Sequence, residues 1–124
     1  TAVLLSIEQC KYLTSLAHQL GMEVALKLYT IEEIDYLECD VDLIIINNRI
    51  ACSFDMDVNK SFEFAKLLPN DCIKVSEGGI YTPEKAKELS DVGFQGIIIG
   101  DLFMKTANPG YALGEFIKGI RKEN

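Results

Sequence analysis

The sequence predicts an α/β fold made of parallel β/α units, and three observations support this. Short apolar segments alternate five times with amphipathic helical segments along the 124 residues. Capping residues precede the helical segments, and polar or glycine residues follow the apolar ones. Such strands pair in parallel through right-handed crossovers, which fits either an open doubly wound sheet or part of a (β/α)₈ barrel. A complete barrel needs about 250 residues, so five units form just over half of one.

The first predicted unit begins at the start of the chain. Residues 3–6 are expected to form the first strand, entered without an initiator Met, and we expect processing or truncation to have removed what came before. Ser6 and Gln9 form a capping box for a helix that Gly21 ends. The predicted apolar face of this helix consists of Tyr12, Leu13, Leu16, Ala17 and Leu20.

The second and third units follow the same pattern. Residues 23–28 are expected to form the second strand, after which Thr30 and Glu33 cap a short helix. Residues 42–46 are expected to form the third strand. This strand is apolar on both faces, as in a parallel strand that is covered on both sides.

The last two units begin after the longest connection, residues 47–58, which precedes a helix near 59–68. The fourth strand is expected at 72–76 and the fifth at 96–99. Thr82-Pro83 is expected to cap the helix between them, and the last helix is expected to begin near Asn108. Its apolar face is formed by Leu113, Phe116, Ile117 and Ile120.

Composition and charge exclude several function classes. The formal charge is −7, and a negative surface would repel nucleic acid. No apolar run approaches the roughly 20 residues that span a bilayer, and no signal peptide is recognisable. We therefore expect a cytoplasmic protein that binds neither nucleic acid nor membrane.

The metal-ligating residue types are scattered. No two of the four cysteines form a C-x-x-C pair, and His18 is the single histidine, so the sequence predicts no zinc site. The cysteines are expected to be reduced and mostly buried. We expect His18 to be solvated or packed on its helix. The cysteines in question are Cys10, Cys39, Cys52 and Cys72.

Polar residues stand at the carboxyl ends of the predicted strands, where ligands bind in open sheets and barrels alike. These residues are Lys27, Tyr29, Asn47, Asn48, Arg49, Ser76, Glu77, Gly100 and Asp101. The glycines at 78, 79 and 100 leave backbone N–H groups accessible, so together they favour a phosphate monoester site. Alternatively, each glycine serves only a tight turn.

The charged and amide residues of this ring each allow two interpretations. Glu77 is either a general acid or base, or the partner of Lys27 or Arg49 in a structural ion pair. Arg49 either binds an anionic group or is an exposed loop residue. The amides of Asn47 and Asn48 either bind substrate hydroxyls or satisfy the backbone of the loop.

Three segments in register resemble one known family. Residues 46–49 read Ile-Asn-Asn-Arg, residues 75–80 read Val-Ser-Glu-Gly-Gly-Ile, and residues 99–104 read Ile-Gly-Asp-Leu-Phe-Met, with Asn-Pro-Gly at 108–110. Together they resemble indole-3-glycerol phosphate synthase, a (β/α)₈ barrel of tryptophan biosynthesis that uses no metal or organic cofactor. Residues 2–5 and 20–23 resemble its fourth strand and the approach to its fifth. The resemblance therefore implies the C-terminal five units of the barrel.

The resemblance also implies roles for individual residues. Asn47 and Glu77 would contact the substrate hydroxyls and reacting centre, and Arg49 would contact the substrate. Gly78 stands where the family usually has Ser. The phosphate of 1-(o-carboxyphenylamino)-1-deoxyribulose 5-phosphate would bind at Gly79, Gly100 and Asp101.

Two departures from the family bear on catalysis. Lys27 stands at the position of a catalytic glutamate, because residues 25–29 read Ala-Leu-Lys-Leu-Tyr where the family usually has Leu-Val-Glu-Val-His. The family's first three strands, which carry a glutamate and two lysines of the active site, have no counterpart here.

Three hypotheses follow for the function of the chain. It is part of a ring-closing, decarboxylating lyase, or a non-catalytic phosphate-binding half-barrel, or a flavodoxin-like open sheet. Unclosed parallel strands leave two edges and an apolar face, so we expect self-association or a missing N-terminal half.

Overall fold

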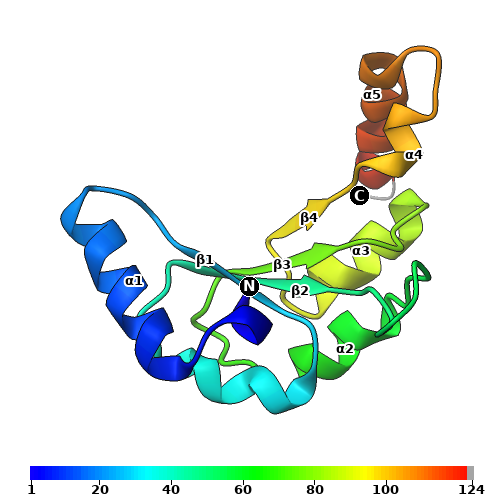
Figure 1. Ribbon diagram of the computed structural model, residues 1–124. Helices are drawn as coiled ribbons and strands as arrows, with labels where there is room; N and C mark the ends of the chain where they lie inside the picture. Colours follow the sequence, from blue (N-terminus) through cyan, green and yellow to red (C-terminus); the bar gives the residue numbers. More distant parts are fainter. Residues whose placement is uncertain (123–124) are drawn as a thin grey trace.

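A four-stranded parallel sheet forms the centre of the computed structural model, which describes residues 1–122 (Figure 1). The strands lie in chain order, β1 to β4, and each is hydrogen-bonded in parallel to the next. Helices occupy the connections between them. The predicted α/β fold with parallel β/α units is therefore confirmed. The strands are β1 (Ala25–Leu28), β2 (Leu43–Asn47), β3 (Lys74–Glu77) and β4 (Gly96–Ile98).

The helices begin where the capping residues predict. The Ser6 hydroxyl accepts a hydrogen bond from the Gln9 N–H at 3.1 Å, and the Gln9 side chain accepts one from the Ser6 N–H at 2.9 Å. Asn108 Oδ1 accepts from the Tyr111 N–H at 3.1 Å. The helical segments are η1 (Ala2–Leu4), α1 (Ile7–Gln19), η2 (Ile31–Glu38), α2 (Asn59–Ala65), α3 (Pro83–Asp91), α4 (Asp101–Met104) and α5 (Pro109–Arg121).

The start of the chain is not a strand, so the prediction of a first strand at residues 3–6 is wrong. Residues 2–4 form a single 3₁₀ turn, in which the Leu4 N–H donates to the Thr1 carbonyl and the Leu5 N–H to the Ala2 carbonyl. A strand needs a neighbouring strand to satisfy its backbone groups. No described strand pairs with this segment, which forms local hydrogen bonds instead. The described sheet thus has four strands where five were expected.

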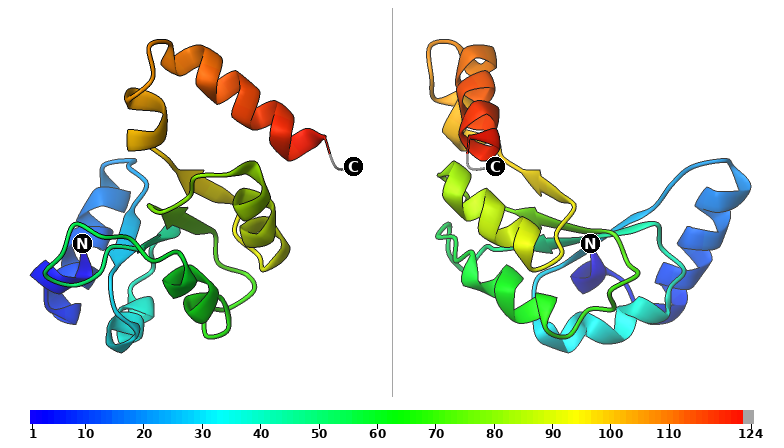
Figure 2. Two further views of the ribbon diagram at one scale, coloured as in Figure 1. Left: turned by 90° about the vertical axis from the view of Figure 1, so that its right-hand side faces the viewer. Right: turned by 180° about the vertical axis from the view of Figure 1, so that it is seen from behind.

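The two faces of the sheet differ in how they are covered. Leu26, Leu28, Ile44 and Ile46 are buried on the face that η2, α2 and α3 cover (Figure 1). The alternate residues point to the other face, which helices leave open, and among them Lys27, Leu43 and Ile45 are only half-buried. In Figure 2, α1 lies at one end of the sheet and α4 and α5 at the other. The expected carboxyl-end site therefore lies along an open, concave face.

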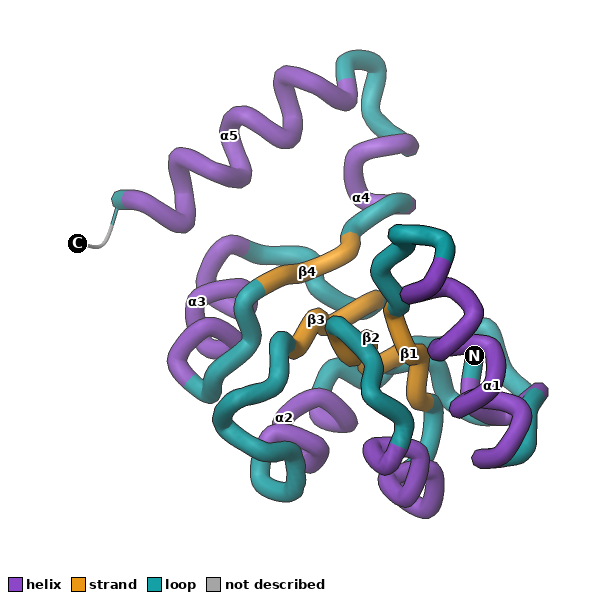
Figure 3. Tube along the Cα trace, turned by 90° about the vertical axis from the view of Figure 1, so that its left-hand side faces the viewer, coloured by secondary structure: helices purple, strands orange, loops and turns teal. Residues whose placement is uncertain are grey.

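The last two helices extend beyond β4 (Figure 3). They are held together by an edge-to-face contact between the rings of Phe103 and Phe116, whose centroids are 5.5 Å apart. Phe116 is buried as predicted, whereas Leu113 and Ile117 of the predicted apolar face are exposed.

Helix α1 has the predicted extent but not the predicted packing. Tyr12 and Leu20 are 68% and 69% exposed, and the buried residues of the helix are Cys10 and Thr14. The capping box and the periodicity define the helix, but its neighbours decide which side is buried. Here α1 packs on η2 through Cys10 and Cys39, so most of its apolar stripe faces outward.

The cysteines are all free, as predicted, but only Cys10 and Cys39 are buried. Burial and the neighbouring Cys10 raise the pKa of the Cys39 thiol to about 12. Within residues 1–122, no helix is long and apolar enough to cross a membrane.

Candidate functional site

Three of the predicted site residues meet on the open face of the sheet. Lys27 Nζ lies 2.9 Å from Glu77 Oε2, and both side chains are about a quarter exposed, at 28% and 25%. Asn47 pairs in register with Glu77, and its Nδ2 donates to the same carboxylate oxygen at 3.4 Å. Of the two ion-pair partners considered for Glu77, the structure selects Lys27.

Arg49 lies in the loop after β2, and its charged group is engaged there. Its Nε donates to the Ser53 carbonyl at 2.8 Å, and its guanidinium carbon lies 4.7 Å from the centroid of the Phe54 ring. Lys60 Nζ donates to the Arg49 carbonyl at 2.7 Å, and burial lowers the pKa of this lysine. The structure therefore does not bring Arg49 to the Lys27–Glu77 pair.

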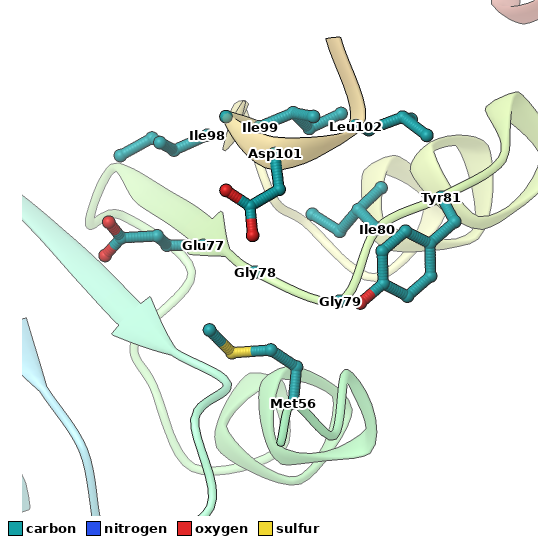
Figure 4. Close-up of a pocket in the computed structure, with 11 residues that line it drawn as sticks. Met56, Glu77, Gly78, Gly79, Ile80, Tyr81, Ile98, Ile99, Asp101 and Leu102 are labelled. Carbon is teal, nitrogen blue, oxygen red and sulfur yellow. The ribbon is translucent and has the colours of Figure 1, made fainter. Parts of the chain in front are cut away.

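The predicted glycine turns line one pocket of about 270 Å³ between β3, β4 and the loop after β2 (Figure 4). Gly78 and Gly79 have φ angles of +96° and +72°, which favour glycine. Gly100 and Asp101 form the facing wall. The lining residues are Met56, Glu77, Gly78, Gly79, Ile80, Tyr81, Ile98, Ile99, Gly100, Asp101 and Leu102.

The backbone of this pocket offers hydrogen-bond donors. The N–H groups of Gly78, Gly79 and Gly100 donate to no other described residue. The single turn of α4 starts at Asp101, with Gly100 as its N-cap. In Figure 4 the Asp101 carboxylate points into the pocket, so an anion there would meet a negative charge beside these donors.

Two candidates lie behind the site and not in it. Asn48 and Ser76 are each 0% exposed and hydrogen-bond each other at 3.0 Å, on the face of the sheet that α2 covers. Tyr29 lies beyond the end of β1, where its N–H donates to Glu33 Oε1 at 3.0 Å. His18 lies outside the site and is exposed, in keeping with the prediction of a solvated residue, and its Nε2 lies 2.8 Å from Asp42 Oδ2.

Met56 is among the pocket residues that the sequence did not predict. Met56 reaches the glycine turn because the long loop folds back on itself, with a bridge between Arg49 and Met56. A Cβ on Gly78 would lie 2.8 Å from Met56 Sδ. Apart from its place in the longest connection, nothing in the sequence marks Met56 as part of a pocket.

No set of three or more histidine, cysteine, aspartate or glutamate side chains that could hold a metal ion occurs within residues 1–122. The polar groups at or beside the pocket are one lysine, two carboxylates, an amide, the Tyr81 hydroxyl and backbone N–H groups. Such a set suits proton transfer and the binding of a small anionic ligand.

Comparison with solved structures supports the barrel fold. A structure described as "Native KDPGal structure" superposes with a TM-score of 0.67 over 95% of this chain and 55% of its own, at 21% identity. This likeness shows the fold alone: the sheet and its helices form part of a (β/α) barrel.

Sequence comparisons identify the family. The family model of indole-3-glycerol phosphate synthase matches residues 2–116. The chain is 45% identical to the indole-3-glycerol phosphate synthase of Bacteroides thetaiotaomicron over 97% of its own length and 46% of the relative. The enzyme of Caldanaerobacter subterraneus is 35% identical over 92% and 44%, respectively. The chain thus spans less than half the length of these curated relatives, and it belongs to the indole-3-glycerol phosphate synthase family.

Proposed function

We propose that this chain forms the phosphate-binding part and one side of the catalytic centre of an indole-3-glycerol phosphate synthase. The reaction would close and decarboxylate 1-(o-carboxyphenylamino)-1-deoxyribulose 5-phosphate in tryptophan biosynthesis, in the cytoplasm. The observation that supports this most is the position of the Glu77 carboxylate, which both contacts Lys27 and borders the glycine pocket. One ligand could thus place its phosphate in the pocket and its reacting carbons beside Glu77.

In this proposal the side chains have separate roles. Glu77, held by Lys27 and Asn47, is the candidate acid or base for the loss of water that follows ring closure. The free N–H groups of Gly78, Gly79 and Gly100 would bind the phosphate. Arg49 would bind the substrate only after leaving Ser53 and Phe54, since these now engage its guanidinium.

The open face favours completion of the barrel by a further polypeptide segment or a second copy. Ile98 on β4 is 40% exposed and the Lys27–Glu77 pair is open to solvent. A phosphate-binding half-barrel without catalytic activity, assembled with another chain, is the second candidate. Lys27 favours this candidate, because it stands where the family resemblance places a catalytic glutamate.

Coexpression with the N-terminal half of the Bacteroides thetaiotaomicron relative tests the proposal. We expect a one-to-one complex by mass measurement and formation of indole-3-glycerol phosphate from the synthetic substrate, with activity lost in Glu77→Gln. A complex that binds the substrate without turning it over would support the half-barrel instead. Full activity of the chain alone as a monomer would contradict both.

A further inference from the structure

A buried hydrogen-bond network lies directly behind the glycine turn. Asn48, Ser61 and Ser76 are each 0% exposed. The Ser61 hydroxyl donates to Asn48 Oδ1 at 2.8 Å and lies 2.6 Å from the Ser76 hydroxyl, to which Asn48 Nδ2 donates at 3.0 Å. The residue after β2, helix α2 and strand β3 are thereby joined on the covered side of the sheet.

Asn48 also holds the turn itself. Its Nδ2 donates to the Gly78 carbonyl at 2.8 Å, and its backbone N–H donates to the Glu77 carbonyl at 2.9 Å. Its own carbonyl accepts from the Asp57 N–H at 2.7 Å. Every polar group of Asn48 therefore has a hydrogen-bond partner. The partners on β3 and the turn after it are three consecutive residues, 76–78.

The hydrogen bond from Asn48 to the Gly78 carbonyl also affects the pocket, because it orients a whole peptide group. The Gly78 carbonyl and the Gly79 N–H belong to the same planar trans peptide, in which the two groups point in opposite directions. Because Asn48 draws the carbonyl toward the buried network, the Gly79 N–H is directed away from it. Gly79 lines the pocket, and this N–H has no partner among the described residues.

We propose that Asn48 is a positioning residue that fixes the Gly78–Gly79 peptide and so presents the Gly79 N–H to a phosphate group. This inference rests on the proposed function of the pocket as a phosphate site. It assigns the two neighbouring asparagines different roles. Asn47 contacts the Glu77 carboxylate on the open face, whereas Asn48 lies on the covered face and acts through its hydrogen bond to the Gly78 carbonyl.

Titration of the ¹⁵N-labelled chain with inorganic phosphate tests this role. Asn48→Asp keeps the size of the side chain but replaces its N–H donors with an oxygen that faces the Gly78 carbonyl. We expect the phosphate Kd to rise about tenfold, with loss of the amide response at Gly79 and retention of the response at Gly100. The matched control, Ser61→Ala, removes a bond of the same network and leaves the Gly78 bond, so its Kd should stay within about twofold of wild type.

Equal phosphate affinity in Asn48→Asp and wild type would overturn the inference, and so would an equal loss in Ser61→Ala. Should Asn48→Asp not fold, Asn48→Ala has the same expected result. The order parameter of the Gly79 N–H, measured without phosphate, should fall in the Asn48 variant only; no change would overturn the inference. Absence of any wild-type response at Gly79 and Gly100 would contradict the phosphate site, while the order parameter still decides the role of Asn48.

Discussion

Lys27 Nζ lies 2.9 Å from Glu77 Oε2, across the width of strand β2. The resemblance of residues 25–29 to the family places a glutamate at position 27, whereas this chain has a lysine that forms an ion pair with Glu77. Asn47, on the strand between them, donates to the same carboxylate oxygen. Lys27 and Asn47 thus share one oxygen of the Glu77 carboxylate.

Breaking this pair should measurably lower stability. Since both side chains are about a quarter exposed, solvent screens the interaction, and we expect a coupling energy of about 1 kcal/mol. A double-mutant cycle of Lys27→Met and Glu77→Gln, measured by urea unfolding, gives this value. Additive effects of the two substitutions would show that the pair contributes no coupling energy.

Restoring the glutamate should raise the activity of the completed barrel. In the complex with the N-terminal half described above, we expect Lys27→Glu to increase turnover about tenfold or more, because it supplies a second carboxylate for proton transfer. Lys66→Glu, an exposed site with the same charge change, is the control. Unchanged turnover in Lys27→Glu would mean that the lysine does not limit catalysis.

The glycine turn should not tolerate a side chain at Gly78. At its φ of +96°, an added Cβ would also lie 2.8 Å from Met56 Sδ, so we expect Gly78→Ala to lower the unfolding free energy by about 1–3 kcal/mol. Adding Met56→Ala should recover only the steric part of this loss. Urea unfolding of wild type, the two single variants and the double variant separates the clash with Met56 from the backbone strain. Complete recovery of stability in the double variant would show that the backbone is not strained.

The Asp101 carboxylate should oppose anion binding in the pocket. Asp101→Asn removes one negative charge near the bound phosphate. We therefore expect this variant to bind inorganic phosphate with a Kd about three- to tenfold lower than that of wild type at low ionic strength. Asp35→Asn, in η2 and outside the pocket lining, changes the net charge equally and serves as the control. Calorimetric titration measures both, and an equal gain in the two variants would point to net charge alone.

The parts of the fold that depend on local interactions could be predicted from the sequence. Ser6 and Gln9 cap α1 through bonds three residues apart, and Asn108 caps α5 in the same way. The strand ends were also predictable, because a run of apolar residues stops where the chain leaves the sheet. The ion pair between Lys27 and Glu77 was also among the interpretations that the sequence allowed for Glu77.

Features that depend on distant partners could not be predicted. Residues 3–6 have the composition of a strand but no neighbour among the described strands, so they form a 3₁₀ turn. Whether Arg49 turns to the site or to Phe54 depends on how an eleven-residue loop folds back to Met56. Asn47 and Asn48 lie on opposite faces because successive residues of an extended chain alternate, but their partners on β3 and its turn, Glu77 for Asn47 and Gly78 for Asn48, are about 30 residues away in the chain.

Acid should weaken the attachment of α1 to the sheet. His18 Nε2 and the Val24 N–H both contact Asp42 Oδ2, at 2.8 and 2.6 Å, and these hydrogen bonds hold the pKa of Asp42 below its usual 3.8. A carboxyl group whose pKa is lower in the folded state stabilises the fold above the unfolded-state pKa, and this contribution is lost as the pH falls through the folded-state value. The melting temperature of the wild-type chain should therefore fall more steeply below about pH 4 than that of Asp42→Asn. Asp40→Asn, an exposed neighbour, should follow the wild type, and coinciding profiles for wild type and Asp42→Asn would show that these bonds do not contribute.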